Sequence, residues 1–129
     1  MNAPGQRRIL IVDDDADMRH SLRLVLAAAG YEVEVAADGS QAIHKQRAHP
    51  ADLVVTDLFM PITDGIETIR QLRSEFPKAK IVAMSGGGAA MPGERYLSAA
   101  HAAGADAILN KPFAAGQIEE CLQRLLDGP

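Results

Sequence analysis

The chain alternates short apolar runs with longer segments in which apolar residues recur every three or four positions. Uninterrupted apolar runs indicate strands buried on both faces of a parallel sheet, and the longer spacing indicates amphipathic helices. The predicted strands cover residues 8–12, 31–36, 53–57, 81–84 and 107–109, and the predicted helices lie near residues 18–29, 41–48, 66–75, 94–103 and 115–126. Residues 31–36 alternate between polar and apolar, which favours a strand near an edge of the sheet.

Regular alternation of strands and helices predicts an α/β fold. Each crossover between parallel strands is right-handed and packs its helix back on the sheet, so helices cover both faces. Five strands fit the flavodoxin-like, doubly wound order 2-1-3-4-5, one of the two common orders for such sheets. We found no internal repeat or linker, and we interpret residues 1–7 as an N-terminal tail and residues 8–127 as one domain.

The composition limits which partners the protein can bind and indicates where in the cell it is expected. The 129 residues carry a net charge of -4, which argues against broad binding to nucleic acid or anionic membranes, because both require a basic face. The sequence has no apolar run of membrane-spanning length and begins without a signal peptide, so we expect a cytoplasmic protein. Its single cysteine, Cys121, falls on the apolar side of the last predicted helix, and we expect a buried, inert thiol.

Polar side chains that can carry chemistry follow four of the predicted strands. Asp13 and Asp14 come after the first strand, Asp57 ends the third, Ser85 follows the fourth and Lys111 follows the fifth. In open α/β sheets, ligands bind in the crevice beyond the carboxyl ends of the strands. We therefore expect these side chains to converge on one site.

The acids in this group favour a metal site. Neighbouring carboxylates repel one another and raise each other's pKa, and a divalent cation removes that conflict. Mg2+ suits the set, because it prefers oxygen ligands and phosphate, while the histidine and cysteine ligands of a zinc site are missing nearby. The alternative for residues 13–15 is that they only cap the following helix.

The hydroxyl and the ammonium suit an anion beside that metal. Lys111 precedes Pro112, and a cis peptide bond there would direct the ammonium over the strand ends. Ser85 precedes a run of glycines whose backbone amides can approach a phosphoryl oxygen closely. Taken singly, Lys111 fits an ordinary surface lysine and Ser85 an ordinary turn.

These segments together closely resemble the receiver domain of two-component response regulators. The resemblance runs from Arg8 to about Leu126. It rests on the sequences ILIVDDD at residues 9–15, LVVTDLFMP at 53–61 with DG at 64–65, IVAMS at 81–85, GAD at 104–106 and NKPF at 110–113. Each segment alone is a weak signal, but all of them occur in the family's order and at strand ends.

The resemblance implies a role for each residue. Asp57 corresponds to the phosphoacceptor, and Asp13, Asp14, Asp57 and the backbone carbonyl of Phe59 to the Mg2+ ligands. Ser85 corresponds to the switch hydroxyl of the family and Lys111 to its lysine. The implied donor is a phosphohistidine on a sensor histidine kinase or a histidine phosphotransfer protein. The implied recipient of the signal is an output partner or a fused output domain, which the sequence does not identify.

The chain departs from the family pattern at two places. Ile108 stands where the family has an aromatic residue that takes part in switching, so a ring rotation cannot operate there. Residues 85–93 form a longer, glycine-rich loop, which is either a tolerated insertion or the moving part of the switch. We expect the four histidines, at positions 20, 44, 49 and 101, to be surface or helix-end residues.

Two other functions remain open at this point. One is an Mg2+-dependent phosphohydrolase that uses an aspartyl phosphate, although Phe59 stands where such enzymes commonly place a second acid. The other is a receiver-like domain that no longer takes phosphate and acts by dimerisation. For a receiver domain we expect no enzymatic activity beyond its own phosphorylation and dephosphorylation.

Overall fold

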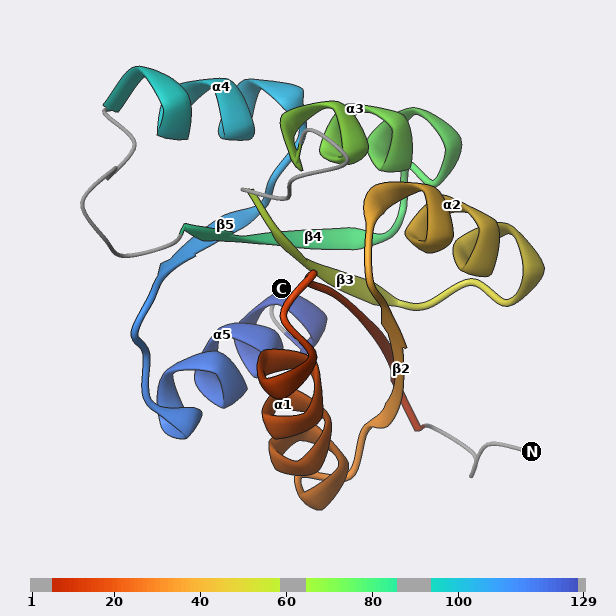
Figure 1. Cartoon of the computed structure of the whole chain (residues 1–129), viewed down its shortest axis with the longest axis vertical. Helices are drawn as coiled ribbons and strands as arrows, with labels where there is room; N and C mark the ends of the chain where they lie inside the picture. Colours follow the sequence, from red (N-terminus) through yellow and green to blue (C-terminus); the bar gives the residue numbers. More distant parts are fainter. Residues whose placement is uncertain (1–5, 59–64, 86–93, 128–129) are drawn as a thin grey trace.

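The computed structural model describes residues 6–58, 65–85 and 94–127 (Figure 1). The strands are β1 (Arg8–Val12), β2 (Glu32–Ala36), β3 (Leu53–Asp57), β4 (Lys80–Ser85) and β5 (Ala107–Asn110). The helices are α1 (Ala16–Ala28), α2 (Gly39–Ala48), α3 (Gly65–Glu75), α4 (Glu94–Ala103) and α5 (Ala115–Asp127). In the described part of the chain, no helix is long and apolar enough to cross a membrane.

The strands form one parallel sheet in the order β2-β1-β3-β4-β5, which confirms the predicted fold class. Figure 1 shows α1 and α5 on one face of the sheet and α2, α3 and α4 on the other. Because all strands run in the same direction, their carboxyl ends lie along one edge of the sheet. That edge is where the sequence predicted a site.

The core has two layers because successive side chains of a strand point to opposite faces. On β1, Leu10 and Val12 belong to the buried cluster on the side of α2 and α3, and Ile9 and Ile11 belong to the cluster shared with α1 and α5. All four are at most 1% exposed. A continuous apolar run is therefore required in β1, because helices cover the sheet on both faces of this strand.

The element boundaries agree with the prediction to within two residues, and the start of β2 shows why one of them differs. The strand begins at Glu32, because the backbone N–H of Tyr31 donates to the carbonyl of Leu26 at 3.1 Å and so still belongs to the end of α1. The preceding residue, Gly30, has a φ of 100°, which glycine adopts readily.

The predicted burial of two residue types is confirmed. The Cys121 side chain lies in the buried cluster beneath α5. Burial raises the pKa of its thiol, which keeps it in the unreactive protonated form. All four histidines are exposed, as expected for residues on helix surfaces and ends.

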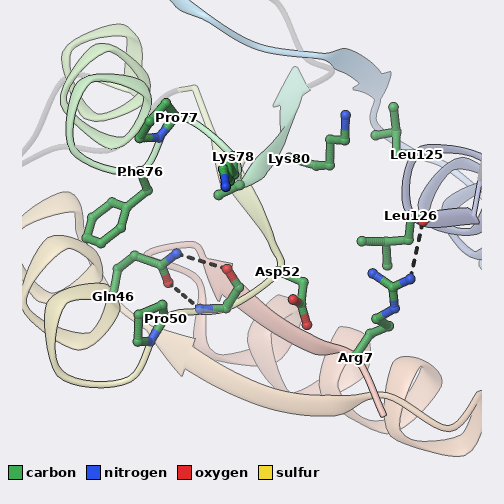
Figure 2. Close-up of a pocket in the computed structure, with 12 residues that line it drawn as sticks. Arg7, Gln46, Pro50, Asp52, Phe76, Pro77, Lys78, Lys80, Leu125 and Leu126 are labelled. Atoms are coloured by element: carbon green, nitrogen blue, oxygen red, sulfur yellow. Dashed lines mark hydrogen bonds between the residues drawn. The ribbon is translucent and has the colours of Figure 1, made fainter. Parts of the chain in front are cut away.

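A cavity of about 380 Å³ lies at the amino ends of β1, β3 and β4, at the edge opposite the predicted site (Figure 2). Its rim carries Arg7, Asp52, Lys78 and Lys80, which combine both charge signs. Beneath it, the Gln46 side chain accepts from and donates to the backbone of Ala51 at 2.8 and 3.0 Å. These bonds close the turn between α2 and β3.

Candidate functional site

Three carboxylates meet at the carboxyl edge of the sheet. Asp13 follows β1, Asp57 ends β3, and β1 pairs directly with β3 through Val12 and Thr56. Oxygens of Asp13, Asp14 and Asp57 lie within 4.8 Å of one another. Asp13 is 0% exposed and Asp57 6%, whereas Asp14 is exposed. The structure thus brings together the acids that the sequence placed on separate strands.

The three consecutive acids at residues 13–15 have different roles, because only one of them caps α1. Asp15 is the N-cap of α1, and its side chain accepts from the backbone N–H of Asp17 at 2.9 Å and of Met18 at 3.5 Å. Asp13 instead accepts from the Asp15 N–H at 2.9 Å, and Asp14 takes no part in the cap. Helix capping therefore explains only the last of the three acids.

Lys111 joins the two buried acids. Its Nζ lies 3.0 Å from Asp13 Oδ2 and 3.3 Å from Asp57 Oδ2, and its side chain is 17% exposed. The peptide bond between Lys111 and Pro112 is cis. Burial disfavours the charged ammonium, but the hydrogen bonds and charges of Asp13 and Asp57 outweigh burial and raise the pKa of Lys111. The lysine therefore stays protonated and contributes a positive charge to the site.

Ser85 ends β4 at the same edge and is 1% exposed. Its hydroxyl is buried and has no hydrogen-bond partner in the described part of the chain. Most buried polar groups in folded proteins are paired, and an unpaired one costs about 1–3 kcal/mol. A buried hydroxyl without a partner at this edge suits a site that receives a further hydrogen-bonding group.

Two sequence expectations concern residues outside the described part. The Phe59 carbonyl, expected as a metal ligand, lies outside it, as does most of the glycine-rich loop after Ser85.

Ile108 is half-buried on β5 and packs against the cluster on the α4 side together with Leu97.

One residue close to the acids, Arg19, is not among those that the sequence placed at the site. Arg19 of α1 donates from Nη1 to the backbone carbonyl of Asp13 at 2.8 Å. The available signal was its place in the first turns of the predicted helix, six residues after Asp13, where a long side chain can reach back to the preceding strand end.

The sheet order and the cluster of acids with a lysine define a flavodoxin-like protein with three carboxylates and an ammonium gathered at the carboxyl edge of its sheet. The chain belongs to the response regulator receiver domain family, whose model matches residues 9–123. It is the receiver domain of a two-component response regulator. This membership does not favour the alternative of a phosphohydrolase.

Relatives agree with this assignment. The chain is 43% identical to the response regulator MprA of Mycolicibacterium vanbaalenii over 118 residues, which cover 92% of this chain and 48% of MprA. MprA of Mycobacterium avium is 42% identical, with 92% and 49% covered. The chain therefore spans about half the length of these relatives.

Solved structures show the same fold. The chemotaxis protein CheY4 of Vibrio cholerae matches with a TM-score of 0.85 and 30% identity, over 94% of this chain and 99% of that one. A CheY-like receiver domain protein of Methanospirillum hungatei matches with a TM-score of 0.89 and 29% identity, over 95% of both chains.

Proposed function

We propose that this domain accepts a phosphoryl group on Asp57 from a phosphohistidine of a sensor histidine kinase or a histidine phosphotransfer protein. The observation that carries the proposal is the convergence of three carboxylates within 4.8 Å, two of which contact Lys111. Family membership supports the same reaction. The phosphorylated domain then acts on an output partner or a fused output domain.

The residues fit Mg2+ as the metal. Asp13, Asp14 and Asp57 offer only oxygen ligands, which this hard cation prefers, and we assign the backbone carbonyl of Phe59 as a further ligand from the family pattern. When bound, Mg2+ neutralises charge that builds up on the phosphoryl oxygens during transfer.

Asp57 is the nucleophile in this proposal. One of its carboxylate oxygens forms a bond to phosphorus, the phosphorus–nitrogen bond to the donor histidine breaks, and the imidazole retains the bonding electron pair. Lys111, already 3.3 Å from Asp57, stabilises the negative charge of the transferred group. Attack of water on the same phosphorus later releases phosphate and restores the carboxylate. The domain thus catalyses only its own phosphorylation and dephosphorylation.

Ser85 links this chemistry to a signal. Phosphorylation adds negative charge and acceptor oxygens at Asp57. The buried hydroxyl of Ser85, which has no partner in the described residues, can donate to one of those oxygens. This hydrogen bond would form only in the phosphorylated state and would therefore distinguish the two states.

Incubation with acetyl phosphate and Mg2+, followed by mass spectrometry of the intact protein, tests the proposal. We expect one phosphoryl group per chain, none with Asp57→Asn or without divalent metal, and unchanged labelling with Asp127→Asn, which removes an exposed acid at the end of α5. Repeated turnover of phosphomonoesters would instead indicate a phosphohydrolase. No labelling of the wild-type chain would indicate a domain that no longer takes phosphate.

A further inference from the structure

The turn after β1 is held by hydrogen bonds of both backbone groups of Asp13. The last paired residue of β1 is Val12, which lies opposite Ala36 and Thr56. Asp13 still donates its backbone N–H to the Ala36 carbonyl at 3.1 Å. The backbone carbonyl of Asp13 lies beyond the paired part of the strand, and a buried backbone carbonyl there needs another hydrogen-bond donor. The Arg19 guanidinium supplies that donor at 2.8 Å.

Every polar group of Asp13 therefore has a partner. The N–H bonds to Ala36, the carbonyl accepts from Arg19, Oδ1 accepts from Asp15 and Oδ2 accepts from Lys111. Of these four partners, Lys111 is the one that also contacts Asp57, at 3.3 Å.

Asp14 is held differently from Asp13. Its side chain is exposed and makes no hydrogen bond or ion pair with the described residues. Its direction depends on the peptide plane that joins it to Asp13, because that unit is rigid. The carbonyl oxygen of this plane is the atom that Arg19 binds. Fixing that oxygen thus limits where the Asp14 carboxylate can point.

We propose that Arg19 is a positioning residue for metal binding: by holding the Asp13 carbonyl, its guanidinium orients Asp14 towards the other two carboxylates. The inference rests on the proposed function, since it assumes that these acids bind Mg2+. It assigns Arg19 no contact with the metal or with the phosphoryl group.

A purely electrostatic role predicts the opposite sign. If Arg19 acted only through its positive charge, removing it would make the acids more attractive to a cation, and Mg2+ would bind more tightly. A positioning role predicts weaker binding, because residues that orient metal ligands typically contribute 10–100-fold to metal affinity. The sign of the change therefore separates the two explanations.

Mg2+ titration calorimetry of the whole chain tests the inference. The variant Arg19→Met keeps the aliphatic stem and removes the donors. We expect it to bind Mg2+ roughly tenfold more weakly than the wild type. Arg19→Lys, which retains a donor of similar reach, should stay within about threefold of the wild type. Arg23→Met removes an equal charge one turn further along α1, at an exposed position, and should leave affinity unchanged.

Unfolding by urea, followed by circular dichroism without metal, separates positioning from general stability. Arg19→Met with lowered stability and unchanged Mg2+ affinity would overturn the inference, as would tighter binding. If Arg19→Met does not fold, Arg19→Gln takes its place, with affinity again expected below that of Arg19→Lys. A wild-type chain that fails to bind Mg2+ would overturn the proposed metal site and this inference with it. Wild-type binding equal to that of Arg19→Met would overturn only the role of Arg19.

Discussion

Lys111 occupies the acid cluster that we assign to Mg2+, and its removal should therefore strengthen metal binding. Its Nζ lies 3.0 Å from Asp13 Oδ2 and 3.3 Å from Asp57 Oδ2. Mg2+ binds carboxylate oxygens at about 2.1 Å, so an ion on either oxygen would lie no more than about 5.4 Å from the ammonium. The two positive charges then oppose each other.

The size of this effect follows from Coulomb's law. A divalent and a monovalent cation about 5 Å apart repel by about 1.7 kcal/mol in bulk water and by about 7 kcal/mol at an effective dielectric constant of 20. The flexible lysine stem can withdraw from an arriving ion, so we take the lower value. Because each 1.4 kcal/mol is a factor of ten, Lys111→Met should bind Mg2+ at least about tenfold more tightly.

Calorimetric titration is the suitable assay, since the chain has no tryptophan to report binding by fluorescence. The matched control is Lys80→Met, which removes an exposed lysine at the amino end of β4, far along the strand from the acids. We expect its affinity to stay within about twofold of the wild type, because solvent and salt screen that distance. Unchanged or weaker Mg2+ binding by Lys111→Met would refute the competition.

Three further predictions concern stability and titration. Gly104→Ala should lower the free energy of unfolding in urea by about 1–3 kcal/mol, because φ is 129° and a Cβ would lie 2.8 Å from an α3 side chain. Gly30→Ala, with positive φ but nothing within 4 Å, should cost less, and equal losses would contradict this reasoning. Ser85→Ala should leave the free energy of unfolding of the unphosphorylated domain in urea unchanged or raise it by up to about 1 kcal/mol, because the hydroxyl lacks a partner among the described residues. A large loss of stability would show that the hydroxyl has a partner. The pKa of Glu75 is lowered to about 2 by hydrogen bonds, first from Arg47 and then from Gln71, so NMR titration of Arg47→Ala should find the pKa raised from about 2 towards the ordinary 4.5. Because the pKa is depressed on folding, this pair supports the fold above pH 4.5 and loses that effect as the pH falls towards 2.

Much of the fold could be predicted because its signals are local. An uninterrupted apolar run such as residues 8–12 indicates a doubly covered strand, and the helical spacing after it indicates a packed helix. The position of Asp57 at a strand's carboxyl end follows from the same pattern. The boundary at Tyr31 was wrong by one residue, because a backbone hydrogen bond to the end of α1 outweighed its strand propensity.

Prediction of the complete site required more than local sequence signals. The sequence by itself determined which residues stand at strand ends: the acids after β1 and β3, the hydroxyl after β4 and the lysine after β5. The tertiary structure decided that Lys111 lies between Asp13 and Asp57, that the Ser85 hydroxyl is buried without a described partner, and that Arg19 reaches the Asp13 carbonyl. The physical reason is that periodicity reports the environment of one segment, whereas contacts between distant residues depend on strand pairing, register and the path of each crossover.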